Sequence, residues 1–197
     1  MLLGGSRAKN KERINSDWDI YLIGDYKIEN ESISEQFLEE YLDIALFPKS
    51  CLKDNVLRIF YGPVSDLKVL LDNEDGLGSQ IVENTEKAYL NKPKLLTSAQ
   101  ILEKINYLNR ILSKIENYKD NPEVSFFHLA QFYQTAIPFW FEFRGEWSVP
   151  VQYAIPIIKS EDLTFYNMLK SIVETNVIEK QIIECKKIIA YYMDRGK

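Results

Sequence analysis

The chain has 197 residues, of which 46% are hydrophobic and 27% charged, a balance typical of a globular protein. Its net charge of -5 argues against sequence-independent binding of nucleic acid, which requires a clustered basic surface. Two cysteines without a C-x-x-C pair exclude a zinc knuckle and a disulfide framework. No apolar run approaches the length of a membrane span and no signal-peptide pattern is present, so we expect a cytoplasmic protein with no membrane partner.

The first part of the chain alternates short apolar runs with polar breaks. Strands are expected at residues 2–3, 17–23, 56–61 and 66–71, where β-branched and aromatic residues gather between turn signals. Residues 34–46 carry apolar side chains at helical spacing before Pro48 and predict a helix. Gly62-Pro63 is predicted to be a turn between the last two strands.

The second part is predicted to be helical. Amphipathic or strongly apolar helices are expected at about residues 101–115, 124–143, 163–173 and 177–193. Pro138 should kink or end the second of these, and Pro150 and Pro156 should bracket an irregular connection. The fold class is therefore α+β, with a small mixed-sheet domain at residues 1–92 and a C-terminal helical bundle at residues 93–197.

Two aspartates at the start of the second predicted strand indicate a metal site that acts on phosphate groups. Residues two apart on a strand point to one face, so Asp17 and Asp19 direct both carboxylates to one place. Gly4-Gly5-Ser6 forms a small-residue turn whose backbone N–H groups can approach phosphate oxygens closely. Because the chain has a single histidine, a metal here must be held by oxygen ligands, which favours Mg²⁺ or Mn²⁺ over Zn²⁺.

These residues match the pattern of a known family. Gly5-Ser6, ten intervening residues and Asp17-x-Asp19 resemble the G-S-x10-D-x-D signature of the nucleotidyltransferase superfamily. That group includes DNA polymerase β, the aminoglycoside nucleotidyltransferases and the minimal nucleotidyltransferases paired with HEPN toxins. The resemblance implies a nucleotidyltransferase domain at residues 1–92. Residues 93–197 are similar to the helical domains appended to antibiotic-modifying members.

The resemblance also implies roles for individual residues. Asp17 and Asp19 would bind Mg²⁺, with two ions expected. Gly5 and Ser6 would contact the triphosphate of the donor nucleotide, ATP, assisted by Arg7 or Lys9.

A third carboxylate is expected on a neighbouring strand. Asp66, within the apolar segment 64–71, matches the family best and would complete the metal cage or take the proton from the acceptor hydroxyl. Asp43, between Leu42 and Ile44, is a weaker competitor because its surroundings predict a helix.

The expected function is the Mg²⁺-dependent transfer of a nucleoside monophosphate from ATP, or another nucleoside triphosphate, to a hydroxyl group. The partners would be the nucleotide and an acceptor, which is a small molecule such as an aminoglycoside or, alternatively, a protein. Glu142 and Glu146 are candidates for binding a cationic acceptor. A different class is a degenerate member that binds nucleotides or partners without catalysis.

Overall fold

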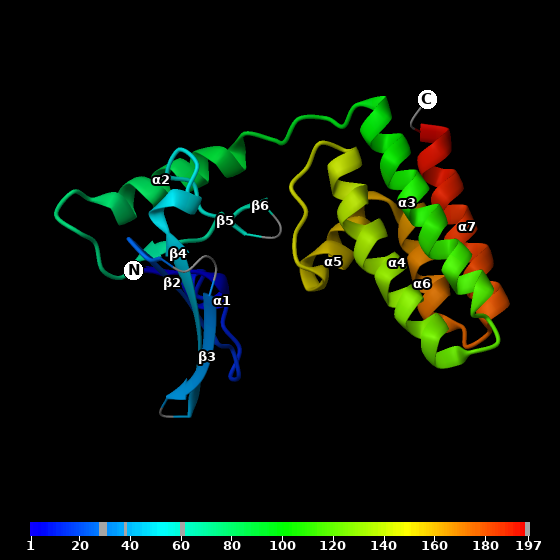
Figure 1. Ribbon diagram of the computed structural model, residues 1–197, viewed down its shortest axis with the longest axis horizontal. Coiled ribbons are helices and arrows are strands. Elements are labelled where there is room, and N and C mark those ends of the chain that lie inside the picture. Colours follow the sequence, from blue (N-terminus) through cyan, green and yellow to red (C-terminus); the bar gives the residue numbers. More distant parts are fainter. Residues whose placement is uncertain (28–30, 38, 60–61, 196–197) are drawn as a thin grey trace. The chain divides into compact units, whose positions relative to one another are not determined.

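The computed structural model describes residues 1–27, 31–37, 39–59 and 62–195. The chain divides into two compact units, Met1–Lys92 and Pro93–Lys197 (Figure 1). The described part of the first unit combines a five-stranded sheet and a separate strand pair with two α-helices and one 3-10 helix, and the described part of the second consists of helices. The predicted α+β class with a helical C-terminal region is confirmed.

The first unit is built on a mixed five-stranded sheet with the strand order β3-β4-β2-β1-β7. Strands β2 and β4 are parallel, and the other neighbours are antiparallel. Strands β5 and β6 form a separate pair. The elements are β1 (Leu2–Leu3), α1 (Gly5–Ala8), β2 (Trp18–Gly24), β3 (Glu31–Phe37), β4 (Glu40–Pro48), the 3-10 helix η1 (Lys49–Cys51), β5 (Arg58–Ile59), β6 (Gly62–Pro63), β7 (Lys68–Val69) and α2 (Leu77–Leu90).

In the region predicted as a helix at residues 34–46, the described residues instead lie mostly in two strands, so that prediction is wrong. Antiparallel β3 and β4 form a hairpin, and β4 pairs in parallel with β2 from Trp18↔Leu42 to Gly24↔Pro48. The apolar residues of this segment fit both a helical and a strand period. Seven paired positions with β2 decide between them, because strand formation depends on neighbours more than on local preference.

One face of the sheet packs against α2. Tyr21 and Phe47 lie on this face with their ring centroids 5.9 Å apart, in an edge-on contact. Leu2 and Leu57 are fully buried in the same cluster, together with Ile81 of α2. This cluster is the hydrophobic core of the first unit.

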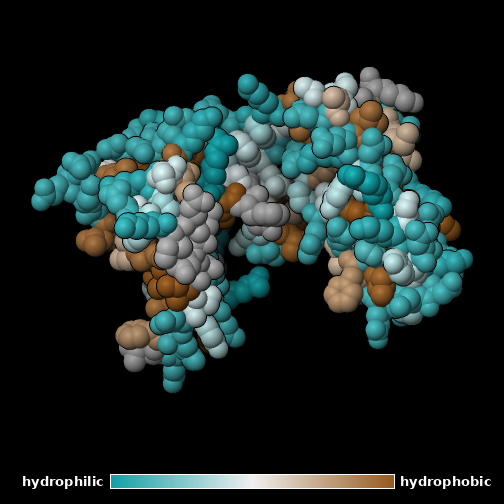
Figure 2. All heavy atoms as spheres, viewed as in Figure 1, coloured by the Kyte–Doolittle hydropathy of each residue, from teal (hydrophilic) through white to brown (hydrophobic). Residues whose placement is uncertain are grey.

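The opposite face of the sheet is also apolar but only half-buried. Ile20 pairs with Ile44 and Leu22 pairs with Leu46, so that their side chains lie in adjacent rows. Figure 2 shows brown, hydrophobic atoms at the surface over β3 and β4 within a mostly hydrophilic exterior. Apolar residues on both faces are typical of a parallel strand pair.

The segment after β4 also differs from prediction. The strands expected at 56–61 and 66–71 are reduced to Arg58–Ile59 and Lys68–Val69 within the described residues, and Gly62-Pro63 is strand β6. Helix α2 was not predicted at all.

Helix α2 begins with side-chain caps. The carboxylate of Asp72 accepts hydrogen bonds from the backbone N–H groups of Gly78 (2.6 Å) and Ser79 (2.9 Å), and also from the Ser79 hydroxyl. Asn73 Oδ1 accepts from the Leu77 N–H at 2.8 Å. The hydrogen bonds from Ser79, Gly78 and Asn73 lower the pKa of Asp72 to about 2. The caps satisfy N–H groups that have no partner within the helix.

The second unit contains α3 (Ser98–Asn117), α4 (Pro122–Phe143), α5 (Val151–Glu161), α6 (Leu163–Glu174) and α7 (Ile178–Arg195). Thr97 and Gln100 form a capping box at the start of α3. Helix α5 replaces the irregular connection expected between Pro150 and Pro156, so that prediction is also wrong. Pro156 lies inside it, where it removes one backbone hydrogen bond, and Ala154 and Ile158 of the same helix are buried. None of the helices described combines the length and apolarity needed to cross a bilayer.

A buried carboxylate joins three helices of this unit. Asp162 caps α6 by accepting from the Phe165 N–H at 2.9 Å. It also accepts from Trp140 Nε1 of α4 at 3.4 Å and from the Tyr191 hydroxyl of α7, and it lies 3.2 Å from Arg195 of α7. Burial alone would raise the pKa of Asp162, but the hydrogen bonds and Arg195 outweigh it and lower the pKa below 3.8.

We expect Asp162→Asn to lower the free energy of unfolding at neutral pH by about 2 kcal/mol, the scale of hydrogen bonds to a charged group. Because the pKa is lowered in the folded state, this stabilisation is present above pH 3.8 and is lost as the pH falls through the folded-state pKa. Urea unfolding followed by far-ultraviolet circular dichroism should therefore show a difference between variant and wild type that shrinks in acid. An equal difference at all pH values would contradict this, and Asp194→Asn, at an exposed position of α7, is the control.

Candidate metal centre

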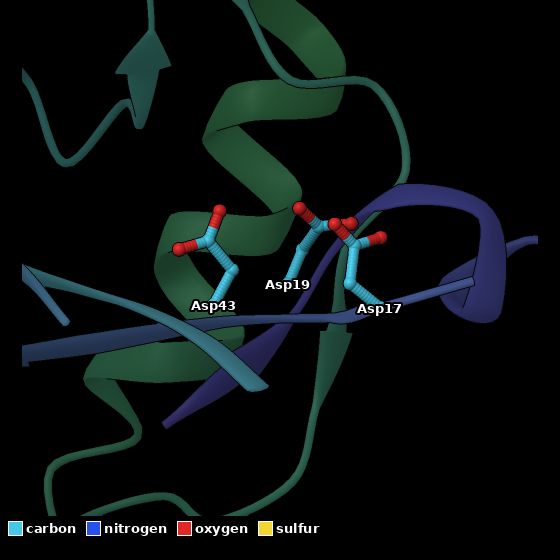
Figure 3. A group of neighbouring side chains, drawn as sticks. All are labelled: Asp17, Asp19 and Asp43. Atoms are coloured by element: carbon cyan, nitrogen blue, oxygen red, sulfur yellow. The ribbon is translucent and has the colours of Figure 1, made fainter. Parts of the chain in front are cut away.

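Three carboxylates meet at the start of the parallel strands. One oxygen each from Asp17, Asp19 and Asp43 lies within 4.8 Å of the others. Figure 3 shows the three side chains side by side, pointing to one side of the sheet. Asp19 is directly paired with Asp43 in the β2–β4 ladder, and Asp17 lies two residues before Asp19 on the same face. The structure therefore brings together the two predicted ligands and one acid from a neighbouring strand.

The third acid of this group is Asp43, not Asp66. Asp66 lies just before β7, forms an ion pair with Lys9 and accepts a hydrogen bond from the Ser65 hydroxyl at 2.8 Å. The reason is topological: because residues 40–48 form a strand parallel to β2, Asp43 comes level with Asp19. The alternation of Leu42, Asp43 and Ile44 was the sequence signal for this arrangement.

The three carboxylates repel one another electrostatically. Asp19 is half-buried, and burial together with the charges of Asp17 and Asp43 raises its pKa above 3.8. Burial and the same carboxylates raise the pKa of Tyr21, the next residue on this face, to about 12. A bound cation would relieve this repulsion, which is a property expected of a metal site.

Two glycines allow the first turn of α1 to approach Asp19. Gly5 has a φ of +65°, and a Cβ atom there would lie 1.8 Å from Asp19 Oδ2. A Cβ on Gly4 would lie 2.4 Å from the Tyr21 ring, and the Gly4 N–H donates to the Asp19 carbonyl at 2.8 Å. Ser6 follows in the helix. The first N–H groups of a helix have no intrahelical acceptor, so this turn offers donors beside the carboxylates.

A hydroxyl from the edge strand orients Asp43. Ser34 of β3 is paired with Asp43 of β4, and its hydroxyl donates to Asp43 Oδ1 at 2.9 Å. The sequence did not reveal this contact, because Ser34 was expected at the start of a helix.

Other predicted site residues have different partners. The Arg7 guanidinium donates to the backbone carbonyls of Ser16 and Asp17 and pairs with Glu40, although it was expected to contact phosphate. In the second unit, the two acids proposed for a cationic acceptor lie against basic side chains: Glu142 with Lys104, and Glu146 with Arg144.

The donor set fits a hard divalent cation. Mg²⁺ with ligands at about 2.1 Å requires oxygens within about 4.2 Å of one another. The carboxylate oxygens lie within 4.8 Å, so small rotations of the exposed Asp17 and Asp43 side chains would suffice. All three candidate ligands are carboxylates, which suits Mg²⁺ or Mn²⁺.

Comparison with known proteins supports the fold. No family model and no curated protein matches the chain. The crystal structure of a nucleotidyltransferase-like protein from Exiguobacterium sibiricum 255-15 matches with a TM-score of 0.58 and 13% identity, over 99% of this chain and 70% of that one. The chain has a nucleotidyltransferase-like fold. The resemblance inferred from Gly5-Ser6 and Asp17-x-Asp19 is thus confirmed at the level of the fold.

We expect Gly5→Ala to disrupt the carboxylate group by displacing the side chain of Asp19. Gly76→Ala is a matched control, because Gly76 has a φ of +66° but no atom lies within 4 Å of the position of its Cβ. Both substitutions place alanine in the left-handed region, at a cost of about 1–2 kcal/mol. Mn²⁺ affinity, measured by calorimetry, should fall only for Gly5→Ala, and equal affinities in the two variants would contradict the close approach.

We expect Asp19→Asn to stabilise the metal-free protein while weakening cation binding. The raised pKa means that folding disfavours the ionised carboxylate, so this cost appears as the pH rises through the folded-state pKa and is present at neutral pH. Removing the charge should add about 1 kcal/mol to the free energy of unfolding, as charge optimisation commonly does. Thermal unfolding without metal tests this, with exposed Glu86→Gln as the control; a destabilised Asp19→Asn would contradict it.

Proposed function

We propose that this chain is a metal-dependent nucleotidyltransferase that transfers a nucleoside monophosphate from a nucleoside triphosphate, expected to be ATP, to a hydroxyl group. The supporting observation is the group of Asp17, Asp19 and Asp43 beside the first turn of α1, in a chain with a nucleotidyltransferase-like fold.

The three carboxylates would hold Mg²⁺, with two ions implied by the family resemblance. Bound Mg²⁺ neutralises the charge of the triphosphate and lowers the pKa of the acceptor hydroxyl. Asp19 is the central ligand because it is half-buried and backed by Tyr21, whereas Asp17 and Asp43 are exposed on either side of it. The proximity of Asp43 to Asp19 supports Asp43, rather than Asp66, as the third residue of the metal cage.

The first turn of α1 would bind the phosphates of the nucleotide. Gly5 and Ser6 begin this helix against Asp19, so their N–H groups lie beside the proposed metal ligands. Phosphate groups are favoured at such a position by N–H groups that have no acceptor within the helix. Cation and triphosphate would thus be bound at adjacent places on one side of the sheet.

The proposed acceptor is a small molecule with a hydroxyl group, and aminoglycosides are the first candidates to test. Because Glu142 pairs with Lys104 and Glu146 with Arg144, these two acids do not support binding of a cationic acceptor, and the aminoglycoside proposal rests on the family resemblance. A protein acceptor is the alternative. Pyrophosphate release from ATP and Mg²⁺ in the presence of aminoglycosides, lincosamides or added protein distinguishes these acceptors.

The identity of the third carboxylate provides the sharpest test. We expect Asp43→Asn to lower turnover, and the affinity for Mn²⁺ with a non-hydrolysable ATP analogue, on the order of 100-fold or more, because loss of a ligand should exceed the 10–100-fold typical of outer-shell changes. Asp66→Asn should have a much smaller effect, since Asp66 pairs with Lys9 outside the group. A larger loss in Asp66→Asn than in Asp43→Asn would identify Asp66, and not Asp43, as the third acid. Wild-type protein that binds neither Mn²⁺ nor the nucleotide would refute the proposed function.

A further inference from the structure

We infer that Arg7 is a positioning residue of the metal centre, which acts by fixing the backbone that carries Asp17. Arg7, Trp18 and Glu40 form a cluster, here called the arginine clamp. The inference rests on the proposed function for the identity of the site, but the role of Arg7 follows from its own contacts.

The guanidinium of Arg7 is directed at the main chain of the segment before β2. Its Nε lies 3.1 Å from the carbonyl oxygens of both Ser16 and Asp17, and its Nη2 lies 2.7 Å from the Ser16 oxygen. The Arg7 side chain is only 14% exposed. A planar guanidinium with several donors in fixed geometry is suited to hold two successive carbonyls in one orientation.

The other two members hold the guanidinium in place. Its central carbon lies 4.3 Å from the ring centroid of Trp18, and Nη2 forms an ion pair with the Glu40 carboxylate. The indole Nε1 of Trp18 donates to the same carboxylate at 3.3 Å. Each member therefore contacts the other two, and the charge of Arg7 is balanced within the clamp.

The arginine clamp holds a part of the main chain that the hydrogen bonds of the sheet do not reach. Strand β2 begins at Trp18, so Asp17 lies just outside the paired region. Asp19 is held by the ladder, whereas the main chain at Asp17 is held by Arg7. Glu40 is the first residue of β4, the strand that carries Asp43. The clamp thus joins the starts of the two strands that supply the carboxylates.

This role differs measurably from direct phosphate binding. If Arg7 were only a phosphate ligand, its replacement would weaken nucleotide binding and leave cation binding in the absence of nucleotide intact. The positioning role also differs from a purely electrostatic effect of Arg7. Removing a positive charge near a cation site should by itself strengthen cation binding. Loss of the arginine clamp should instead weaken cation binding.

The experiment is a Mn²⁺ titration of the full chain without nucleotide, followed by calorimetry or electron paramagnetic resonance. The variants are Arg7→Lys, which keeps the charge but not the planar donors, Arg7→Ala, and Glu40→Gln. Arg13→Ala is the matched control, because Arg13 is an exposed arginine of the same segment. We expect Mn²⁺ affinity to fall about tenfold in Arg7→Lys and Arg7→Ala, the scale found for groups that orient metal ligands, and to stay unchanged in Arg13→Ala.

Circular dichroism and thermal unfolding separate positioning from loss of fold. If Arg7→Ala does not fold, Arg7→Lys and Glu40→Gln decide the question. Folded Arg7 variants that bind Mn²⁺ as tightly as wild type, or more tightly, would overturn the inference alone. Failure of wild-type protein to bind Mn²⁺ would instead overturn the proposed function, and this inference with it.

Discussion

The parallel pairing of β2 with β4 is the constraint on which the candidate site depends. Its register places Asp19 level with Asp43 and continues through Tyr21↔Ala45 and Ile23↔Phe47. The same ladder therefore sets both the acidic group and the apolar rows that pack toward α2. A shift by one residue would turn Asp43 to the other face and replace it with an apolar neighbour. Core packing and the geometry of the carboxylates are thus fixed by one set of backbone hydrogen bonds.

The site lies at the end of the hydrophobic core, and this has an energetic consequence. Asp19 and Tyr21 are successive residues on one face, so the carboxylate is partly desolvated by the core that begins at Tyr21. Burial and two neighbouring acids make the ionised form of Asp19 unfavourable, as its raised pKa reflects. A protein that places acids so close together without a cation gives up stability, a cost that is characteristic of functional sites.

The helical unit stabilises its buried carboxylate, Asp162, in a different way. Its core is strongly aromatic, with Phe139 stacked on Tyr192 at 4.2 Å and Trp140 stacked on Phe165 at 6.3 Å between centroids. The carboxylate of Asp162 receives donors from α4, α6 and α7, and its pKa is lowered rather than raised. Asp19 and Asp162 are both partly desolvated aspartates, but only Asp162 is surrounded by donors. This contrast separates a structural carboxylate from one available to a ligand.

The sequence by itself determined the features that depend on neighbouring residues. Alternation along a strand placed Asp17 and Asp19 on one face, and Gly4-Gly5-Ser6 predicted a close turn leading into α1. The long helices of the second unit followed from their apolar stripes, because such stripes must be buried.

Tertiary structure alone decided which residues distant in the sequence come close to Asp17, Asp19 and the turn before α1. Residues 34–46 fit a helix as well as a strand, and only pairing with β2 made them strands and brought Asp43, instead of Asp66, to Asp19. Arg7 likewise contacts the Ser16 and Asp17 carbonyls and Glu40, and its position after Gly-Ser did not indicate these partners. The physical reason is the same in both cases: backbone pairing and charge partners far apart in the chain outweigh local preferences, and one sequence does not display them.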